Sequence, residues 1–226
     1  NITEVASIVS GSTPSGVDDL YEVNADIPFF RVGDMNSQGN DMWMNNAKNS
    51  LSELNAKKLK LKICEVGTVI FPKRGAAIYT NKKRILSRPS AYDLNTMGLV
   101  PNEKVDKMYF FHWFNSLDLK DLADGSSVPQ LNNRQILPIQ IPLPALSIQI
   151  KIANILNTAD VLKRKDMALM KKYDKLKHAL FLNMFGDPVS NSKKWKVRKL
   201  KEISEKIHSG NTPKGGSAVY VEEGIT

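Results

Sequence analysis

The sequence predicts an α+β fold: a globular head of mixed helices and strands over residues 1–145, then a long coiled-coil-type helix over residues 146–185. Within the head, short β-rich segments stopped by Gly or Pro alternate with short helical segments. After residue 145, apolar residues recur at steps of three and four. Near the end an early phrase returns, which predicts that residues 186–226 are a linker and the beginning of a second head.

The repeated phrase is residues 8–14, which recur as residues 207–213 with five of seven positions identical and an offset of 199 residues. Tyr21 and a following Ile27 are echoed by Tyr220 and Ile225. Chance turn chemistry is the alternative, because Gly and Pro occur in loops of every kind. The downstream matches favour a restarted domain, and we expect the chain to be part of a longer protein with two copies of the head.

The first half of the head predicts four elements. Apolar residues at three-residue spacing over residues 2–8 predict a short helix that ends at the following Ser-Gly pair. Residues 27–33 and 66–71 are β-rich and predict strands. Between them, residues 50–58 predict a helix capped by one of the two serines at its start.

The second half of the head predicts three more elements. Residues 108–114 are too apolar and aromatic for a solvent-facing element, so they predict a buried helix with His112 and Trp113 as core residues. Residues 132–137 predict a short helix. Residues 139–141 predict a strand, which the following Pro-Leu-Pro would end.

The long helix has the spacing of a helix that buries one narrow apolar seam. About 38 residues at 1.5 Å each span roughly 57 Å, too long for the core of a small domain. The seam therefore needs a partner, either a similar helix after a second head or the same helix of another chain. Asp166 would set the register or mark a slight rotation of the seam. The predicted seam residues are Ile152, Ile155, Ala159, Leu162, Leu169, Tyr173, Leu176 and Leu180.

The net charge of +9 is unevenly distributed. Residues 1–145 hold 16 Lys and Arg against 15 Asp and Glu, whereas residues 146–226 hold 16 against 8. Within the head, however, residues 48–88 are rich in Lys and Arg and contain only Glu53 and Glu65 as acidic residues. Clustered positive charge suits a surface that contacts phosphates, since each contact releases counterions. A solvated face is the alternative.

The sequence offers little for catalysis or for metal binding. Cys64 is the single cysteine and lies in an apolar stretch, which favours a buried structural thiol. One cysteine and three histidines give no spacing for structural zinc, so we expect no metal and no cofactor. Phosphate-cradling loops, dinucleotide turns, the His-Glu-x-x-His pair and the nucleophile elbow are missing from the sequence, as is an Asn/Asp-Pro-Pro-aromatic segment of a base methyltransferase. A nuclease site built from Asp34, Glu65 and Lys73 is a weaker reading.

Apolar runs in the sequence are all shorter than the roughly 18 residues that a membrane span needs. Residue 1 does not open a signal peptide. The sequence therefore predicts a cytoplasmic protein without a membrane partner.

In combination, the motifs resemble the specificity subunit of type I restriction-modification systems. Each motif is weak by itself, whereas their order around a long helix and a restarting domain is specific. The match extends over the whole chain. The matching residues are Gly11, Thr13 and Pro14; Ile27, Pro28, Phe29, Gly33, Asp34 and Met35; Lys73, Arg74 and Gly75; Pro129, Gln130, Leu131 and Asn132; Ile141, Pro142, Leu143, Pro144, Leu146 and Gln149; Met184, Phe185, Gly186, Asp187 and Pro188; and Trp195.

The resemblance implies a non-catalytic subunit that binds double-stranded DNA, with methyltransferase (M) and restriction (R) subunits as partners. Residues 1–145 would be the first target-recognition domain, which reads one half of a split target, and residues 146–185 the spacer helix. Residues 186–226 would open the second recognition domain, the rest of which the sequence lacks.

We expect affinity from Lys and Arg contacts to phosphate, and base contacts from polar side chains on loops. Reversing the charges of residues 82–84 is then expected to abolish DNA binding and to leave the circular dichroism unchanged. The competing hypothesis is a coiled-coil dimerisation scaffold whose head binds another protein. The candidate DNA-facing residues are Lys73, Arg74, Lys82, Lys83, Arg84 and Arg88, with Arg31, Ser12 and Thr13 as weaker candidates.

Overall fold

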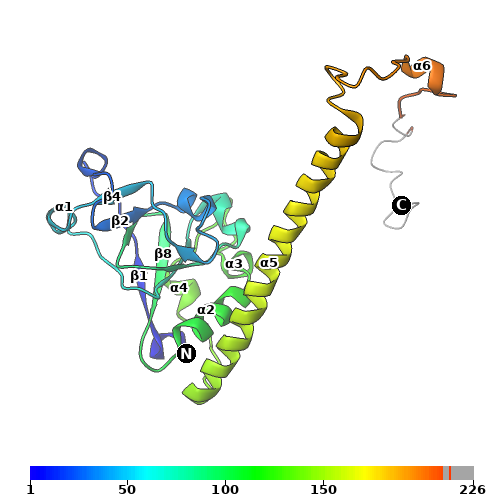
Figure 1. Ribbon diagram of the computed structural model, residues 1–226. Coiled ribbons are helices and arrows are strands. Elements are labelled where there is room, and N and C mark those ends of the chain that lie inside the picture. Colours follow the sequence, from blue (N-terminus) through cyan, green and yellow to red (C-terminus); the bar gives the residue numbers. More distant parts are fainter. Residues whose placement is uncertain (211–213, 215–226) are drawn as a thin grey trace. The chain divides into compact units, whose positions relative to one another are not determined.

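The computed structural model describes residues 1–210 and residue 214 (Figure 1). It divides into two compact units, Asn1–Lys165 and Asp166–Thr226. The first unit contains the head and the first part of the long helix. The last three positions of the repeated phrase, together with Tyr220 and Ile225, lie outside the described residues. The mixed α+β fold predicted from the sequence is confirmed.

The larger sheet of the head has five strands in the order β1-β8-β5-β6-β3. Adjacent strands are antiparallel except β3 and β6, which are parallel. The predicted strand over residues 66–71 is confirmed as β5, which lies in the middle of this sheet. The strands are β1 (Ala6–Ser10), β3 (Trp43–Met44), β5 (Val69–Pro72), β6 (Arg84–Leu86) and β8 (Thr96–Pro101).

The first strand corrects a prediction. Instead of a helix over residues 2–8, the structure has one 3-10 turn, η1 (Ile2–Glu4), followed by β1. The apolar spacing fits both, because Ile2 and Val5 are buried in the turn and Ile8 is half-buried on the strand. Pairing with β8, from Ala6 opposite Pro101 onward, supplies the backbone hydrogen bonds that a helix would have supplied internally.

The smaller sheet has three strands in the order β4-β2-β7: β4 (Asn49–Leu51), β2 (Ile27–Phe30) and β7 (Ala91–Tyr92). The predicted strand over residues 27–33 is confirmed in its first part. It stops at Phe30 because the 3-10 helix η3 (Val32–Asn36) follows, and the Asp34 carboxylate accepts the backbone N–H of Arg31 over 2.8 Å. All four residues of β2 are buried, since apolar clusters cover both faces of this strand.

The short helices of the head agree with the sequence, whereas one predicted strand does not. In α1 (Glu53–Lys58) the N-cap is Ser52, while Ser50 lies in β4. The predicted buried helix is α2 (Lys107–Ser116), although His112 and Trp113 are half-buried at its edge. The predicted strand at residues 139–141 is irregular, and only one of its carbonyls pairs with the N-terminal turn. The remaining helical elements of the head are η2 (Asp18–Leu20), η4 (Gly75–Thr80), α3 (Leu119–Leu122) and α4 (Asn133–Ile136).

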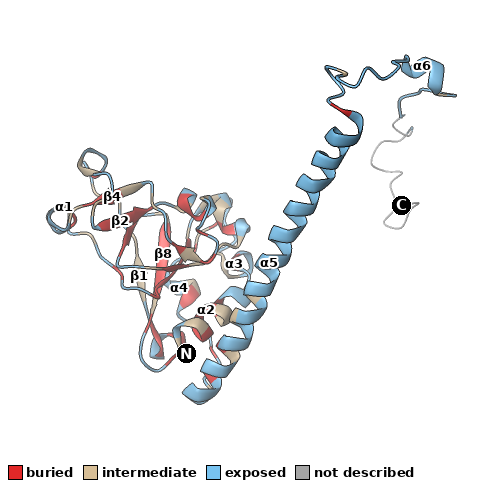
Figure 2. Ribbon diagram, viewed as in Figure 1, coloured by how far each residue is buried: buried red, intermediate tan, exposed pale blue. Residues whose placement is uncertain are grey.

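Three apolar clusters hold the head together. The largest packs one face of the five-stranded sheet against α2, α4 and the start of α5 (Leu146–Phe185). A second lies between the two sheets and contains the buried, free Cys64, as predicted. The third packs the small sheet against α1. Figure 2 shows the buried residues concentrated in the strands and in α2.

Helix α5 runs for 40 residues, which confirms the predicted long helix. Its first turns pack on the head through buried Gln149 and Ala153 and half-buried Ile152. Beyond them, the predicted seam residues are exposed, from 46% for Leu169 to 69% for Ile155. After α5, the indole of Trp195 donates a hydrogen bond to the Phe185 carbonyl over 2.8 Å, and the short helix α6 (Leu200–Ile203) follows.

Candidate nucleic-acid interface

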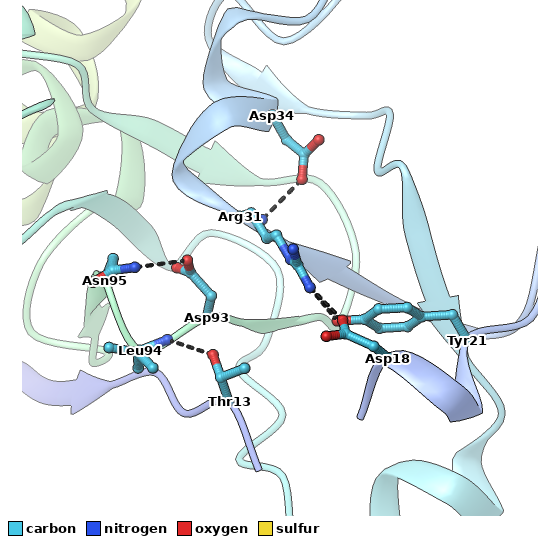
Figure 3. A network of polar contacts seen from close by, with 8 residues as sticks. All are labelled: Thr13, Asp18, Tyr21, Arg31, Asp34, Asp93, Leu94 and Asn95. Carbon is cyan, nitrogen blue, oxygen red and sulfur yellow. Dashed lines mark hydrogen bonds and ion pairs between the residues drawn. The ribbon is translucent and has the colours of Figure 1, made fainter. Parts of the chain in front are cut away.

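Three loops of the head meet at the turn formed by residues 93–95, which joins β7 to β8. The first loop follows β1. Its Gly11 donates a backbone hydrogen bond to Thr96 over 3.0 Å, and Thr13 Oγ1 accepts the backbone N–H of Leu94 over 3.1 Å (Figure 3). A Cβ on Gly11 would lie 2.1 Å from the carbonyl oxygen of Asp93, so only glycine lets this loop approach so closely.

The second loop follows β5 and begins with Lys73 and Arg74. The backbone N–H of Lys73 donates to the carbonyl of Asn95 over 2.8 Å, which holds this loop against the same turn. Burial lowers the pKa of the Lys73 ammonium, Arg74 lowers it further, and Asp93 opposes both effects. Arg74 is exposed and reaches the side chain of Gln130 at 3.5 Å.

The third loop follows β2 and presents Arg31. Its Nη2 group contacts the carboxylate of Asp18 and donates a hydrogen bond to the Tyr21 hydroxyl over 3.4 Å. The guanidinium carbon lies 5.9 Å from the centroid of the Tyr21 ring, within cation–π range. Hydrogen bonding to Tyr21 raises the pKa of Arg31 more than the nearby Asp18 does. Figure 3 shows these side chains together.

Asp93 links the three loops. Its backbone N–H donates to Phe30, just before Arg31, over 2.9 Å, and its carboxylate accepts a hydrogen bond from Thr96 over 2.6 Å. Burial raises the pKa of Asp93, whereas the hydrogen bonds from Thr96 and Asn95 and the charge of Arg31 lower it. Five of the nine predicted residues are therefore gathered around one turn. We call this set the loop cluster: Ser12, Thr13, Arg31, Lys73 and Arg74.

The second predicted basic group, residues 82–84, is only partly at the surface. Lys83 is buried, with 0% of its surface exposed. Its ammonium donates to Asn81 Oδ1 and to the Leu117 carbonyl, both over 2.6 Å, and lies 5.6 Å from the Phe114 ring. Burial lowers the pKa of Lys83 to about 8. The structure thus contradicts the expectation that Lys83 faces phosphates, because its ammonium group is buried and hydrogen-bonded inside the head.

Arg84 also serves the fold. Its guanidinium donates to the backbone carbonyls of Met35, Asn40 and Lys83, which ties η3 and the loop after it to strand β6. Burial lowers the pKa of Arg84. Reversing the charges at Lys83 and Arg84 would therefore disturb the fold itself, and the circular dichroism should change with it. Lys82 is half-buried and bonds to a side chain of η3.

Arg88 is exposed. It lines a surface cavity of about 210 Å³ together with Lys48, Asn49 and Tyr21. Tyr21 also contacts the guanidinium of Arg31, so one aromatic ring borders both sites.

Sequence reasoning missed Asp18 and Tyr21 as partners of Arg31. Tyr21 carried a signal, its apparent recurrence as Tyr220, whereas Asp18 carried none. Within residues 1–210 and 214, no group of three or more His, Cys, Asp or Glu residues is placed to hold a metal ion. In the same part of the chain, no helix is long and apolar enough to cross a membrane.

Residues 1–171 match the family described as "Type I restriction modification DNA specificity domain", and the chain belongs to this family. A curated relative, the type I restriction enzyme MjaIX specificity subunit of Methanocaldococcus jannaschii, is 25% identical over 231 residues. That match covers 94% of this chain and 52% of the relative, so the chain spans about half of its length.

Solved structures show the same fold. One is from work described as the structural basis of complex assembly and conformational transition of the type I R-M system, with a TM-score of 0.60, 17% identity, and coverage of 79% of this chain and 43% of that one. Another is the HsdS subunit from Thermoanaerobacter tengcongensis, with a TM-score of 0.53, 16% identity, and coverage of 76% and 38%.

Proposed function

We propose that this chain is a non-catalytic DNA-recognition subunit of a type I restriction-modification complex, and that its head binds duplex DNA sequence-specifically. The family match over residues 1–171 carries this proposal. In finer terms, residues 1–145 read one half of a bipartite target and residues 146–185 form the spacer helix. Residues 186–226 lead into a second recognition domain. Methyltransferase and restriction subunits would supply the chemistry.

The loop cluster is the proposed DNA-facing surface. Its members come from three loops that a single turn holds together, which is how a rigid scaffold presents side chains to a ligand. Arg74 and half-buried Lys73 supply positive charge for phosphates, and Ser12 and Thr13 supply short polar groups. Lys82 and Arg88 remain candidates for outer phosphate contacts. The head as a whole is nearly neutral, so attraction depends on where these charges lie.

The proposed role of α5 follows from its exposed seam. Leu162, Leu169 and Leu176 are each about half exposed, although they occupy successive positions of an apolar stripe. Exposed apolar stripes of this spacing are typical of helices that pair with another helix. We propose that a second long helix, from the same protein or from another copy, packs on this seam.

The test is the salt dependence of binding to duplex DNA, measured with the full chain and the subunits that accompany it. Each phosphate contact contributes about 0.9 to the slope of log K against log salt concentration. The double variant Lys73→Gln/Arg74→Gln should lower both the affinity and this slope, by about one to two. The matched control is Lys104→Gln/Lys151→Gln, which removes the same charge from two exposed sites outside the loop cluster.

A control that weakens binding as much as the test variant would show that net charge, not the loop cluster, attracts DNA. The alternative function is a coiled-coil scaffold with a protein-binding head, which the exposed seam also favours. A scaffold predicts no DNA affinity for salt to reduce, so the same salt series separates the two.

A further inference from the structure

Leu94 lies in the turn around which the loop cluster is gathered, and it is an apolar residue among polar ones. It is the second residue of a β-turn that the backbone N–H of Thr96 closes by donating to the Asp93 carbonyl over 3.1 Å. Turns of this kind favour Gly, Pro, Asn, Asp and Ser, which support the turn through their backbone or their side chains. A leucine side chain has no group that could do so, and its presence therefore needs another reason.

The exposure of Leu94 does not supply a packing reason. Leu94 is 41% exposed, and among the described residues it belongs to none of the three apolar clusters of the head. Single exposed leucines are common on protein surfaces and by themselves indicate nothing. Leu94 differs from them in its position, because all three loops of the proposed DNA-facing surface are tied to its turn.

Hydrogen bonds from the three loops fix the backbone on both sides of Leu94. Its own N–H donates to Thr13 Oγ1 over 3.1 Å (Figure 3). The residue before it donates its N–H to the carbonyl of Phe30, just before Arg31, over 2.9 Å. The carbonyl of the residue after it accepts the N–H of Lys73 over 2.8 Å. The leucine is therefore held before any ligand arrives, so little backbone entropy is lost when its side chain is covered.

A DNA duplex offers an apolar side chain two kinds of contact. In the major groove, the apolar group on the base edges is the C5-methyl of thymine. In the minor groove, apolar side chains act as wedges between base steps. A wedge has to stand clear of the protein, whereas more than half of the surface of Leu94 is already covered. Its partial exposure favours contact with a methyl group.

The residues around Leu94 favour DNA over a protein as the occupant. Lys73 and Arg74 have no ion-pair partner among the described residues, so their charges are available to phosphates. Ser12 and Thr13 add short polar groups that suit base edges. Phosphate contacts carry no sequence information, whereas an apolar contact with one base does.

We propose that Leu94 recognises a thymine of the target, through an apolar contact with the C5-methyl group in the major groove. Thr13 is a positioning residue, because its hydroxyl oxygen holds the N–H of Leu94. This inference rests on the proposed function and adds one base contact to it. It predicts that the recognised sequence contains a thymine whose methyl group contributes to binding.

The test begins with the target motif, selected from a random duplex pool by the full chain, purified with the subunits that accompany it. Each thymine of that motif is then replaced in turn by deoxyuridine, which differs only in lacking the methyl group. One replacement should weaken binding by wild type about fourfold, as expected for one buried methyl group. The same replacement should leave the affinity of Leu94→Ala unchanged, because the contact is already lost.

The variants separate the methyl contact from other effects of the leucine. Leu94→Ala should bind the thymine motif about 3- to 8-fold more weakly than wild type. Its salt slope should be unchanged, because no charge is removed. Leu94→Met keeps an apolar side chain of similar volume and should keep the deoxyuridine effect.

The matched control is Leu137→Ala, which shortens a leucine of 42% exposure outside the loop cluster. Leu94→Ala and Leu137→Ala should unfold at similar urea concentrations, whereas only Leu94→Ala should weaken DNA binding. The deoxyuridine series on wild type needs no variant, so it tests the contact independently of any effect on folding.

Three outcomes would overturn the inference while leaving DNA recognition intact. One is a motif in which no deoxyuridine replacement weakens wild type, which would leave Leu94 as a wedge or a bystander. Another is a deoxyuridine effect that Leu94→Ala retains in full, which would assign the methyl contact to a different residue. The third is loss of an accompanying subunit from Leu94→Ala, which would make the leucine a protein contact. If wild type itself selects no motif, the proposed function fails, and the inference fails with it.

Discussion

The ammonium group of Lys83 donates a hydrogen bond over 2.6 Å to the carbonyl oxygen of Leu117, the residue that follows helix α2. A buried lysine thus joins the start of β6 to the end of α2. The negative charge of Asp118 raises the pKa of Lys83, but it only partly offsets the larger effect of burial. The charged form is therefore held in the interior against its preference for water.

This lysine predicts a pH dependence of stability. The pKa of Lys83 is about 8 in the folded protein against an ordinary 10.5, so the unfolded state binds more protons between these values. The free energy of unfolding should therefore rise with pH across this window, by on the order of 1 to 3 kcal/mol. Urea unfolding at pH 7.5 and at pH 10 measures the rise. Lys83→Met should lack it, and a variant with the wild-type slope would refute this assignment.

Gln149 predicts a structural requirement at the start of α5. Its Oε1 accepts the backbone N–H of Asp106 over 2.9 Å, and its Nε2 donates to the Pro144 carbonyl over 2.8 Å. Gln149→Leu leaves both groups without these partners and should lower the free energy of unfolding by about 1 to 3 kcal/mol. Gln140→Leu, at an exposed position, should change it by less than about 0.5 kcal/mol. Equal effects would show that the loss is not specific to this link.

Gly11 predicts a steric requirement of the loop cluster. A methyl group there meets the Asp93 carbonyl at 2.1 Å, so Gly11→Ala should lower the free energy of unfolding by about 1 to 3 kcal/mol. It should also displace Ser12 and Thr13 and weaken DNA binding. Gly33→Ala is the matched control, because a Cβ there meets no described atom within 4 Å. Thermal unfolding of both variants gives the comparison, and a fully stable Gly11→Ala would contradict this close approach.

The seam of α5 predicts an effect on association without an effect on the head. Leu169→Gln/Leu176→Gln replaces two side chains that are 46% and 52% exposed, so stability should change by less than about 0.5 kcal/mol per site. Pairing with a second helix should weaken at least tenfold, as measured by sedimentation. Lys172→Gln/Lys175→Gln, also exposed, serves as control. Wild type that stays monomeric at high concentration would count against pairing between copies.

Much of the fold followed from local patterns. Helix α5, helix α2 and strands β2 and β5 are dense or strongly periodic, so the sequence alone predicts them. Strand β1 could not be predicted from its local sequence. Its extended conformation depends on pairing with β8, which lies about 90 residues away in the chain. The prediction of a strand at residues 139–141 was wrong for the opposite reason. The segment has a β-rich pattern, but no neighbouring strand of the described structure pairs with it.

The five residues of the loop cluster were suggested by the sequence, whereas their arrangement was not. Arg31, Thr13 and Lys73 were separate suggestions from three places in the sequence. Only the turn at residues 93–95 shows that they are neighbours. In the sequence, Lys83 and Arg84 looked like the other residues of the basic run over residues 48–88, because such a run carries no information about which side chain points inward. Ion-pair partners such as Asp18 are likewise invisible until the chain is folded.

The hydroxyl of Tyr92, a buried residue of the small sheet, donates a hydrogen bond to the Val9 carbonyl of the large sheet over 3.1 Å and lies 3.2 Å from the Cys64 thiol. Gly98 leaves the room for this phenol, since a Cβ there would lie 2.2 Å from the hydroxyl. On the proposed function, exchange of loop sequences should therefore change the DNA target where Tyr92 and Gly98 are kept. A chimera that alters either residue should disturb the packing between the two sheets. The exchanged loops would then no longer be held in their positions relative to one another.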